Sequence, residues 1–234
     1  MAVTYYNPQW GASRPIRGIL FDMDGLVLDS EILFTRFWRE AANALGYPMT
    51  VEQSYGMRSL GKKLGQPYLE SLFGPGIDYT TVREKRIELM SAYVAKYGIA
   101  PKPGIYELLD YMDEQGIPAA IASSSPMDAI EKHLKAVNLL HRFQRVCSAH
   151  SIPNGKPAPD IYLLAAAQLG LRPEECLALE DSPTGILSAN RAGCLPVMIP
   201  DLDQPGKDTE TLLFAKADSL IDIIAILNAQ NGHL

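Results

Sequence analysis

The sequence predicts an α/β protein: a Rossmann-like parallel sheet with helices on both faces, and an all-helical domain inserted near its start. Three observations support this prediction. A short apolar run at residues 16–21 ends in acidic residues and glycine, as a buried strand entering a loop does. Residues 31–100 show only helical periodicity. After Pro101, helical patterns alternate with short apolar runs, which is typical of parallel crossover units.

The individual elements follow from periodicity and from glycine or proline at their ends. In the inserted segment we expect helices at 31–46, at 57–73 in one or two pieces, and at 80–97. The rest of the chain predicts helices at 105–115, 127–137, 159–169, 184–192 and 219–228, and strands at 117–123, 143–147, 176–179 and 196–199. We therefore predict a core of residues 15–30 and 101–234 and a helical insertion of residues 31–100.

Composition bounds the class of protein. With 234 residues, 47% of them hydrophobic, the chain can bury a core without disulfides. Its three cysteines form no paired short spacing, which argues against a disulfide framework or a zinc cluster and suits a reducing cytoplasm. The net charge of −6 gives no attraction to nucleic acid or anionic membranes. No run could span a bilayer, and the start lacks a signal-peptide pattern, so we expect a cytoplasmic monomer.

Polar residues follow four of the predicted strands. They are Asp22, Asp24, Ser123, Lys156, Glu180 and Asp181. Ligands of open parallel sheets bind at the carboxyl ends of the strands, so these residues can converge. Together they suit phosphoryl transfer, which needs an in-line nucleophile and neutralisation of charge on the phosphoryl oxygens. Carboxylates also suit Mg²⁺, which prefers hard oxygen ligands.

Asp22 and Asp24 could simply form a turn with Gly25. At the end of a buried strand, however, two acids repel each other unless a cation is present. One carboxylate can then ligate Mg²⁺ and attack phosphorus, forming an aspartyl phosphate. The other can act as general acid to the leaving group and later as base for water.

Each of the remaining positions also has a structural alternative. Serine ahead of Pro126 is a common helix N-cap, an interpretation that we keep for Ser125, whereas Ser123 and the Ser124 amide can bind a phosphate oxygen. Lys156 could be a solvated loop charge, or it could hold the transferring phosphoryl group. Glu180 and Asp181 could favour a helix N-terminus. In the functional interpretation Asp181 ligates Mg²⁺ and Glu180 holds the waters of the metal.

In this ordered set the chain resembles the haloacid dehalogenase superfamily of phosphohydrolases. The resemblance covers nearly the whole chain from residue 16. Its motifs are Phe21-Asp22-Met23-Asp24-Gly25, Ser123, Lys156-Pro157-Ala158-Pro159-Asp160 and Glu180-Asp181-Ser182. It implies an inserted helical cap domain, Asp22 as nucleophile, Asp24 as acid and base, Ser123 and Lys156 on phosphate, and Asp181 on Mg²⁺. It also implies that Asp24 binds the metal through its backbone carbonyl, whereas the dehalogenase branch lacks an acid there.

Within that superfamily the chain is similar to the group of sugar-phosphate phosphatases and β-phosphoglucomutases, through residues 24–31, 122–126 and 178–182. The similarity implies that Arg58 in the cap reaches the substrate, although a surface arginine would look the same. The mutases of this group carry a histidine where Phe34 stands here, which favours a phosphatase.

We therefore predict a magnesium-dependent phosphatase acting on a small phosphorylated metabolite such as a sugar phosphate. Three alternatives remain. A phosphosugar mutase would use the same core. A phospho-accepting regulatory domain would lack the inserted cap and carry its acceptor aspartate after a later strand. A catalytically silent binding domain could share the fold, although the complete set of acids argues against it.

Overall fold

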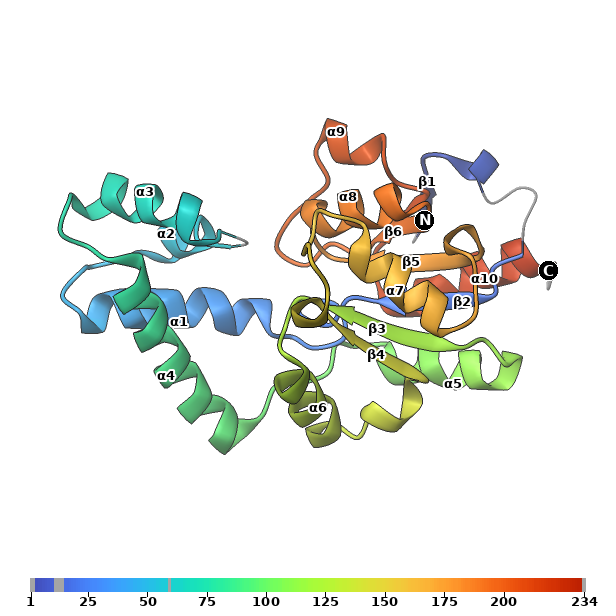
Figure 1. Ribbon diagram of the computed structural model, residues 1–234, viewed down its shortest axis with the longest axis horizontal. Helices are drawn as coiled ribbons and strands as arrows, with labels where there is room; N and C mark the ends of the chain where they lie inside the picture. Colours follow the sequence, from blue (N-terminus) through green and yellow to red (C-terminus); the bar gives the residue numbers. More distant parts are fainter. Residues whose placement is uncertain (1–2, 11–14, 59, 233–234) are drawn as a thin grey trace. The chain divides into compact units, whose positions relative to one another are not determined.

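The computed structural model describes residues 3–10, 15–58 and 60–232 (Figure 1). The chain divides into two compact units. One unit consists of Met1–Leu28 and Ala100–Leu234 and is called the core unit here. The other consists of Asp29–Ile99 and is called the helical unit. Each unit has its own buried apolar cluster, and each is described separately below.

A seven-stranded sheet forms the centre of the core unit among the described residues, in the order β1-β7-β6-β5-β2-β3-β4. Neighbouring strands are parallel, apart from β1, which pairs antiparallel with β7. The predicted α/β fold class is confirmed. The strands are β1 (Val3–Tyr5), β2 (Gly18–Phe21), β3 (Ala119–Ser123), β4 (Arg145–Ser148), β5 (Cys176–Glu180), β6 (Leu195–Met198) and β7 (Ala215–Ala217).

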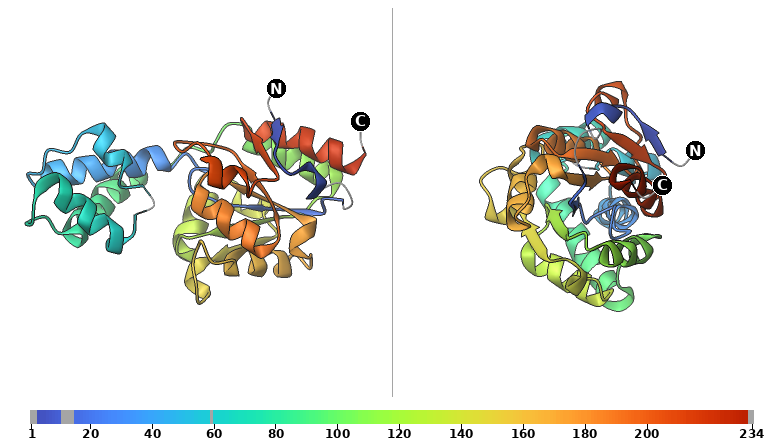
Figure 2. Two further views of the ribbon diagram at one scale, coloured as in Figure 1. Left: turned by 90° about the horizontal axis from the view of Figure 1, so that it is seen from above. Right: turned by 90° about the vertical axis from the view of Figure 1, so that its right-hand side faces the viewer.

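Helices cover both faces of this sheet. They are α5 (Ile105–Gln115), α6 (Met127–Ala136), α7 (Asp160–Gln168), α8 (Pro183–Ala192), the short α9 (Lys207–Glu210) and α10 (Ile223–Asn231). From β2 the chain moves outward to β3 and β4, whereas β5 to β6 moves in the opposite direction. Right-handed crossovers therefore place α7 and α8 on the face opposite α5. Figure 2 shows α5 and α10 side by side on one face, with α7 and α8 on the other.

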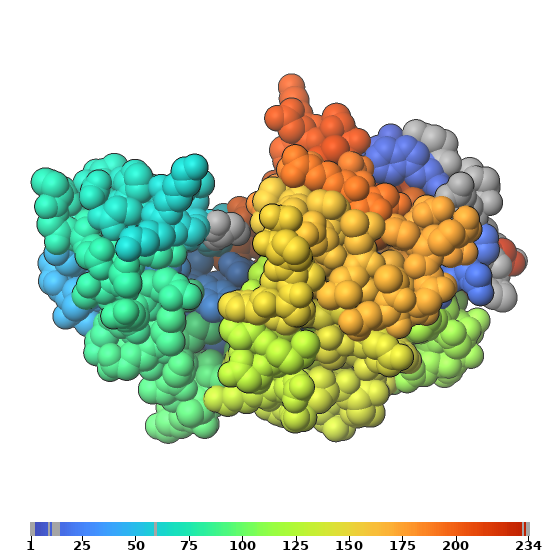
Figure 3. Space-filling view, in the orientation of Figure 1, coloured from blue at the N-terminus to red at the C-terminus, as the bar shows by residue number. Residues whose placement is uncertain are grey.

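The face under α7 and α8 is lined with small residues. Alanines of β3 and β5 pack against alanines of the two helices, and the sheet residues of this cluster are fully or almost fully buried. Small side chains allow the helices to lie close to the sheet. The start of α7 is therefore held near the ends of β2 and β5. In the space-filling view, the gold and orange atoms of α7 and of the loop before it form much of the visible face of the core unit (Figure 3).

The helical unit contains α1 (Glu31–Ala44), α2 (Val51–Tyr55), α3 (Lys62–Phe73) and α4 (Tyr79–Tyr97). Local sequence signals start two of these helices. Thr50 and Gln53 form a reciprocal capping box at α2, and the Asp78 carboxylate accepts the Thr81 N–H at 2.7 Å at the start of α4. The unit is held by its own apolar cluster, which includes Trp38, Met49, Met57, Leu69, Tyr79 and Val82.

The structure adds elements that periodicity did not predict. Strands β1 and β7 have three residues each, too few to show an alternating pattern, and α9 is a single turn. The expected strand at 143–147 begins two residues later, because Phe143 ends a short 3₁₀ turn. No helix within the described residues is both long enough and apolar enough to cross a bilayer.

Candidate active site

The site is built where β2 and β5 end side by side. Phe21 pairs with Leu179 in the register of the two strands, and the Asp22 N–H donates to the Leu179 carbonyl at 3.0 Å. The next residues of the two strands are Asp22 and Glu180, followed by Asp181. Crossovers leave these neighbouring strands in opposite directions, so this is the topological switch point of the sheet, where open α/β proteins bind ligands.

Lys156 reaches this point from the loop before α7. Its Nζ donates to Asp22 Oδ1 at 2.5 Å and to Glu180 Oε1 at 2.6 Å, and its side chain is only 8% exposed. The loop is tied to α8, because Ser188 Oγ donates to the Ala158 carbonyl at 2.6 Å and Arg191 donates to the Pro157 carbonyl at 3.0 Å. Lys156 is therefore a fixed buried cation, and the alternative of a solvated loop charge is wrong.

Glu180 is buried beneath Lys156. Besides Lys156, its carboxylate accepts the Tyr162 hydroxyl at 2.5 Å and the Ser182 hydroxyl at 3.2 Å. Ser182 is also the N-cap of α8, where its oxygen accepts the Gly185 N–H. A Cβ at Gly185 would overlap the Glu180 carboxylate, so any larger residue there would require the carboxylate to move.

The segment after β3 supplies serines beside Asp24. Ser125 Oγ donates to Asp24 Oδ2 at 2.8 Å, while the buried Ser123 Oγ accepts the Ser125 N–H at 3.0 Å. The N-cap of α6 is Pro126, so the N-cap interpretation of Ser125 is wrong: its side chain turns towards Asp24 instead. Ser124 is exposed at the end of the strand.

The buried acids shift one another's protonation. Burial raises the pKa of Asp22 to about 8; the Lys156 ammonium opposes this rise, and the carboxylates of Glu180 and Asp24 add to it. Burial alone would lower the pKa of Lys156, but the carboxylates of Asp22 and Glu180 outweigh it and raise that pKa. Lys156 therefore remains an ammonium, and Tyr162, whose pKa is raised by burial and then by Glu180, remains a hydroxyl donor.

The donor set fits a hard divalent cation. Asp22, Glu180 and Asp181 each offer a carboxylate oxygen, and these oxygens lie within 4.8 Å of one another. One lysine does not balance these buried charges, and a cation among them would lower the pKa of Asp22 again. Because Glu180 already accepts bonds from Lys156, Tyr162 and Ser182, Asp22 and Asp181 are the better ligands. The Asp24 carboxylate is not part of this group.

The family model described as haloacid dehalogenase-like hydrolase matches residues 16–193 of this chain. The chain belongs to the haloacid dehalogenase-like hydrolase family. Hexitol phosphatase A of Escherichia coli (strain K12) is 33% identical over 178 residues, which cover 76% of this chain and 80% of that protein. Hexitol phosphatase B of the same strain is 29% identical over 228 residues, covering 91% and 96% respectively.

A solved structure is similar to this chain over most of its length. CbbY from Rhodobacter sphaeroides, crystallised in complex with phosphate, matches with a TM-score of 0.71 and 25% identity, covering 89% of this chain and 96% of that chain. The family match, together with relatives that are named as phosphatases, confirms the prediction that the chain is a phosphoric monoester hydrolase.

Two site residues of this haloacid dehalogenase-like hydrolase were missed in the sequence. Tyr162 lies on the buried face of α7 with Ile161, Ala165 and Ala166. A buried tyrosine needs a partner for its hydroxyl, and this requirement was the available signal. Ser125 was assigned to a helix end, and only the fold shows that its hydroxyl meets Asp24.

Arg58 lies in the helical unit, just after α2. Its guanidinium stands over the Tyr55 ring, 5.2 Å from the centroid. Phe34, in α1, is covered by the Arg86 guanidinium at 5.0 Å. The structure thus places both residues within the helical unit only, and a substrate role for Arg58 stays a prediction.

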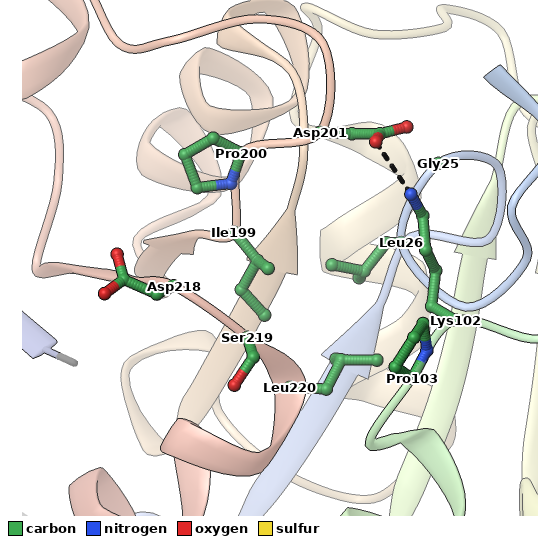
Figure 4. Close-up of a pocket in the computed structure, with 10 residues that line it drawn as sticks. All are labelled: Gly25, Leu26, Lys102, Pro103, Ile199, Pro200, Asp201, Asp218, Ser219 and Leu220. Atoms are coloured by element: carbon green, nitrogen blue, oxygen red, sulfur yellow. Dashed lines mark ion pairs between the residues drawn. The ribbon is translucent and has the colours of Figure 1, made fainter. Parts of the chain in front are cut away.

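A separate pocket of about 170 Å³ lies in the core unit (Figure 4). Gly25 and Leu26, from the loop after Asp24, line one side of it, and an ion pair between Lys102 Nζ and Asp201 Oδ1 at 2.7 Å closes another. The described residues that line this pocket do not include Asp22, Glu180 or Asp181. This pocket is therefore distinct from the carboxylate site.

Proposed function

We propose that this chain is a magnesium-dependent phosphatase that hydrolyses a small sugar phosphate through an aspartyl-phosphate intermediate on Asp22. The observation that carries the proposal is the contact of Lys156 Nζ with Asp22 Oδ1, next to the carboxylates of Glu180 and Asp181. A carboxylate, a buried positive charge and further carboxylates of the kind that bind metals thus lie together at one switch point of the sheet, which supports the proposal.

In the first half-reaction, a carboxylate oxygen of Asp22 attacks phosphorus, and the bond between phosphorus and the ester oxygen breaks. Asp24 gives its proton to the leaving alkoxide, which departs as an alcohol. In the second, water attacks the phosphorus of the aspartyl phosphate. Asp24 accepts the proton of that water, and inorganic phosphate leaves while the Asp22 carboxylate is restored.

Other side chains of the site hold these groups in place. Lys156 offers its ammonium to the phosphoryl oxygens next to the attacking oxygen. The Ser125 hydroxyl orients the Asp24 carboxylate, and Ser123 with the Ser124 amide would bind a phosphoryl oxygen. Asp22, Asp181 and the Asp24 carbonyl would hold Mg²⁺, and Glu180 would orient its waters. The bound ion would neutralise negative charge on the phosphoryl group.

Substrate class is inferred from the relatives. Hexitol phosphatases A and B and the phosphorylated carbohydrates phosphatase of Thermotoga maritima are named for carbohydrate phosphates, and the last is 28% identical over 215 residues. We assign substrate selection to residues 31–100 as a cap, with Arg58 as a contact, and catalysis to residues 15–30 and 101–234. The enzyme would act as a cytoplasmic monomer, with no nucleic-acid or membrane partner.

A substrate screen tests this function. Purified protein is incubated with phosphorylated hexitols, aldoses and ketoses, and with nucleotides for comparison, and released phosphate is measured with and without Mg²⁺. We expect release from at least one sugar or hexitol phosphate, with Mg²⁺ only, and none from Asp22→Asn. Release from nucleotides alone would contradict the substrate class, and release by Asp22→Asn at the wild-type rate would contradict the mechanism.

A further inference from the structure

Glu180 is buried and accepts hydrogen bonds from three side chains. A group that only orients the waters of a metal would not need so many fixed contacts. Glu180 is 1% exposed, and its carboxylate accepts from Lys156, Tyr162 and Ser182. Lys156 and Tyr162 share one oxygen, Oε1, at 2.6 and 2.5 Å. A carboxylate with donors on both oxygens has its orientation fixed, because any rotation breaks at least one charge-assisted hydrogen bond.

Tyr162 contacts Lys156 as well as Glu180. The lysine Nζ lies 5.1 Å from the centroid of the Tyr162 ring, within cation–π distance, while the hydroxyl of the same residue donates to Glu180. Tyr162 is fully buried on α7, whose first residue follows the Lys156 loop closely. A single side chain therefore restrains the ammonium both directly and through its carboxylate partner.

Helix α8 also packs against the Glu180 carboxylate. Gly185 leaves only enough room for the carboxylate, since a Cβ there would overlap its carboxyl carbon and both oxygens. Ser182 joins the two parts: its hydroxyl donates to Glu180 and accepts from the Gly185 N–H. Tyr162, Ser182 and Gly185 therefore form a socket around the Glu180 carboxylate that accommodates it in one orientation.

We propose that Tyr162 and Gly185 are positioning residues that act through Glu180 to hold the Lys156 ammonium against Asp22. The inference rests on the proposed function, in which Lys156 stabilises the transferring phosphoryl group. In the proposed mechanism neither residue touches the reacting atoms. Their contribution is to keep Lys156 Nζ at its distance from Asp22 while charge develops during the reaction.

Tyr162→Phe is the sharpest test, because it removes one hydroxyl and keeps the ring under Lys156. The matched control is Tyr111→Phe, which removes the hydroxyl that donates to Asn228 at 2.6 Å, between α5 and α10. We expect Tyr162→Phe to lower kcat about 10-fold with KM changed less than about twofold, as for loss of an outer partner of a catalytic site. Tyr111→Phe should leave kcat unchanged, although it should lower the melting temperature about as much as Tyr162→Phe does. Equal kcat values for the two variants would overturn the proposal.

Gly185→Ala provides a second variant. It should lower kcat more than Tyr162→Phe does, about 100-fold, because the Glu180 carboxylate must move. Asn190→Ala, further along α8, where the Asn190 Nδ2 donates to the Leu212 carbonyl at 3.2 Å, is its control for small changes in this helix. Wild-type kcat in a folded Gly185→Ala protein would contradict the role of the socket.

A readout without substrate separates this inference from the proposed function. Urea midpoints are measured without Mg²⁺ for Tyr162→Phe, Lys156→Met and the double variant. Because both side chains bind Glu180 Oε1, we expect the two losses not to add. Additive losses would overturn the network even if the protein is an active phosphatase. A wild type that is inactive on every phosphate ester would refute the proposed function, while non-additive midpoints would still support the network.

Discussion

Lys156 Nζ lies 2.5 Å from Oδ1 of Asp22, a residue 134 positions earlier in the chain. The side chains are 8% and 11% exposed, so the contact is largely shielded from water. In such surroundings an ammonium interacts with a developing negative charge much more strongly than it would in solvent. The two residues form one unit, and losses from changing either or both should not add.

Replacing Asp22, the proposed nucleophile, should abolish turnover. Asp22→Asn keeps the size of the side chain but removes the attacking oxyanion, so phosphate release should fall by several orders of magnitude. Stability should not fall with it, since the change removes one of several mutually repelling buried carboxylates. Phosphate release and urea unfolding check both points. Asp128→Asn, at an exposed acid on α6, is the control. Substantial turnover by folded Asp22→Asn would rule out the assignment.

Removal of Mg²⁺ should silence the enzyme, and added Mg²⁺ should restore it. Asp181→Ala should raise the Mg²⁺ concentration needed for half-maximal activity by at least about 10-fold, because a ligand is lost. In the absence of substrate, Mg²⁺ should raise the melting temperature of the wild type but hardly that of Asp181→Ala. Full activity in excess chelator, or an equal shift in both proteins, would refute the proposed metal site.

Hydrolysis should prevail over phosphoryl return to the sugar. Phe34 can neither donate nor accept a side-chain hydrogen bond, whereas a mutase must hold a sugar hydroxyl in place and suppress attack by water. A hexose phosphate is supplied, and free phosphate and isomeric hexose phosphate are measured together. We expect phosphate to form faster than isomer. The reverse order would make the chain a mutase and leave the assignments of Asp22 and Asp181 intact.

The three thiols should be unreactive in the native protein at pH 8. Burial raises the pKa of Cys147 to about 11 and that of Cys176 to about 12, and it also raises that of Cys194. The thiolate needed for reaction with a disulfide reagent is therefore scarce, and labelling should be on the order of 100-fold slower than in denaturant. One thiol that reacts at the denatured rate would contradict this expectation.

The same thiols make stability depend on pH. Unfolded thiols ionise above about pH 8.5, whereas the folded ones stay protonated. The native state therefore binds more protons, and the free energy of unfolding should fall as the pH rises from about 8.5 towards 11. The free energy of unfolding of the Cys147→Ala variant should fall less steeply over this pH range than that of the wild type. A free energy of unfolding that rises with pH over this range would contradict the predicted direction of the pH dependence.

The order of helices and strands was predictable because periodicity and glycine punctuation are local signals. Helix α5 was predicted at its observed bounds, whereas β1 and β7 were missed because three residues carry no pattern. The acids of the site could be found because they follow apolar runs directly. Their placement together depends on Phe21 pairing with Leu179, a long-range register that local patterns do not contain.

The partners of the acids were the least predictable part. In the sequence, Tyr162 fits the apolar pattern of α7 and so gives no sign of a polar role. Gly185 is an ordinary residue near the start of α8. The two helices bring both residues to Glu180, and this depends on how closely small residues let the helices approach the sheet. The role of Ser125 was assigned wrongly for the same reason: its partner, Asp24, lies 101 positions away.

The pairing of β2 with β5 has a consequence for how the enzyme is made. Asp22 leaves the ribosome well before Glu180 and Asp181, because the strand that brings these two residues beside it begins more than 150 residues further along the chain. Until then the Asp181 carboxylate is missing from the proposed metal site, and β2 lacks its neighbour β5. A polypeptide released early, before Cys176, would carry Asp22 and the whole helical unit, and by the proposed mechanism it would be inactive.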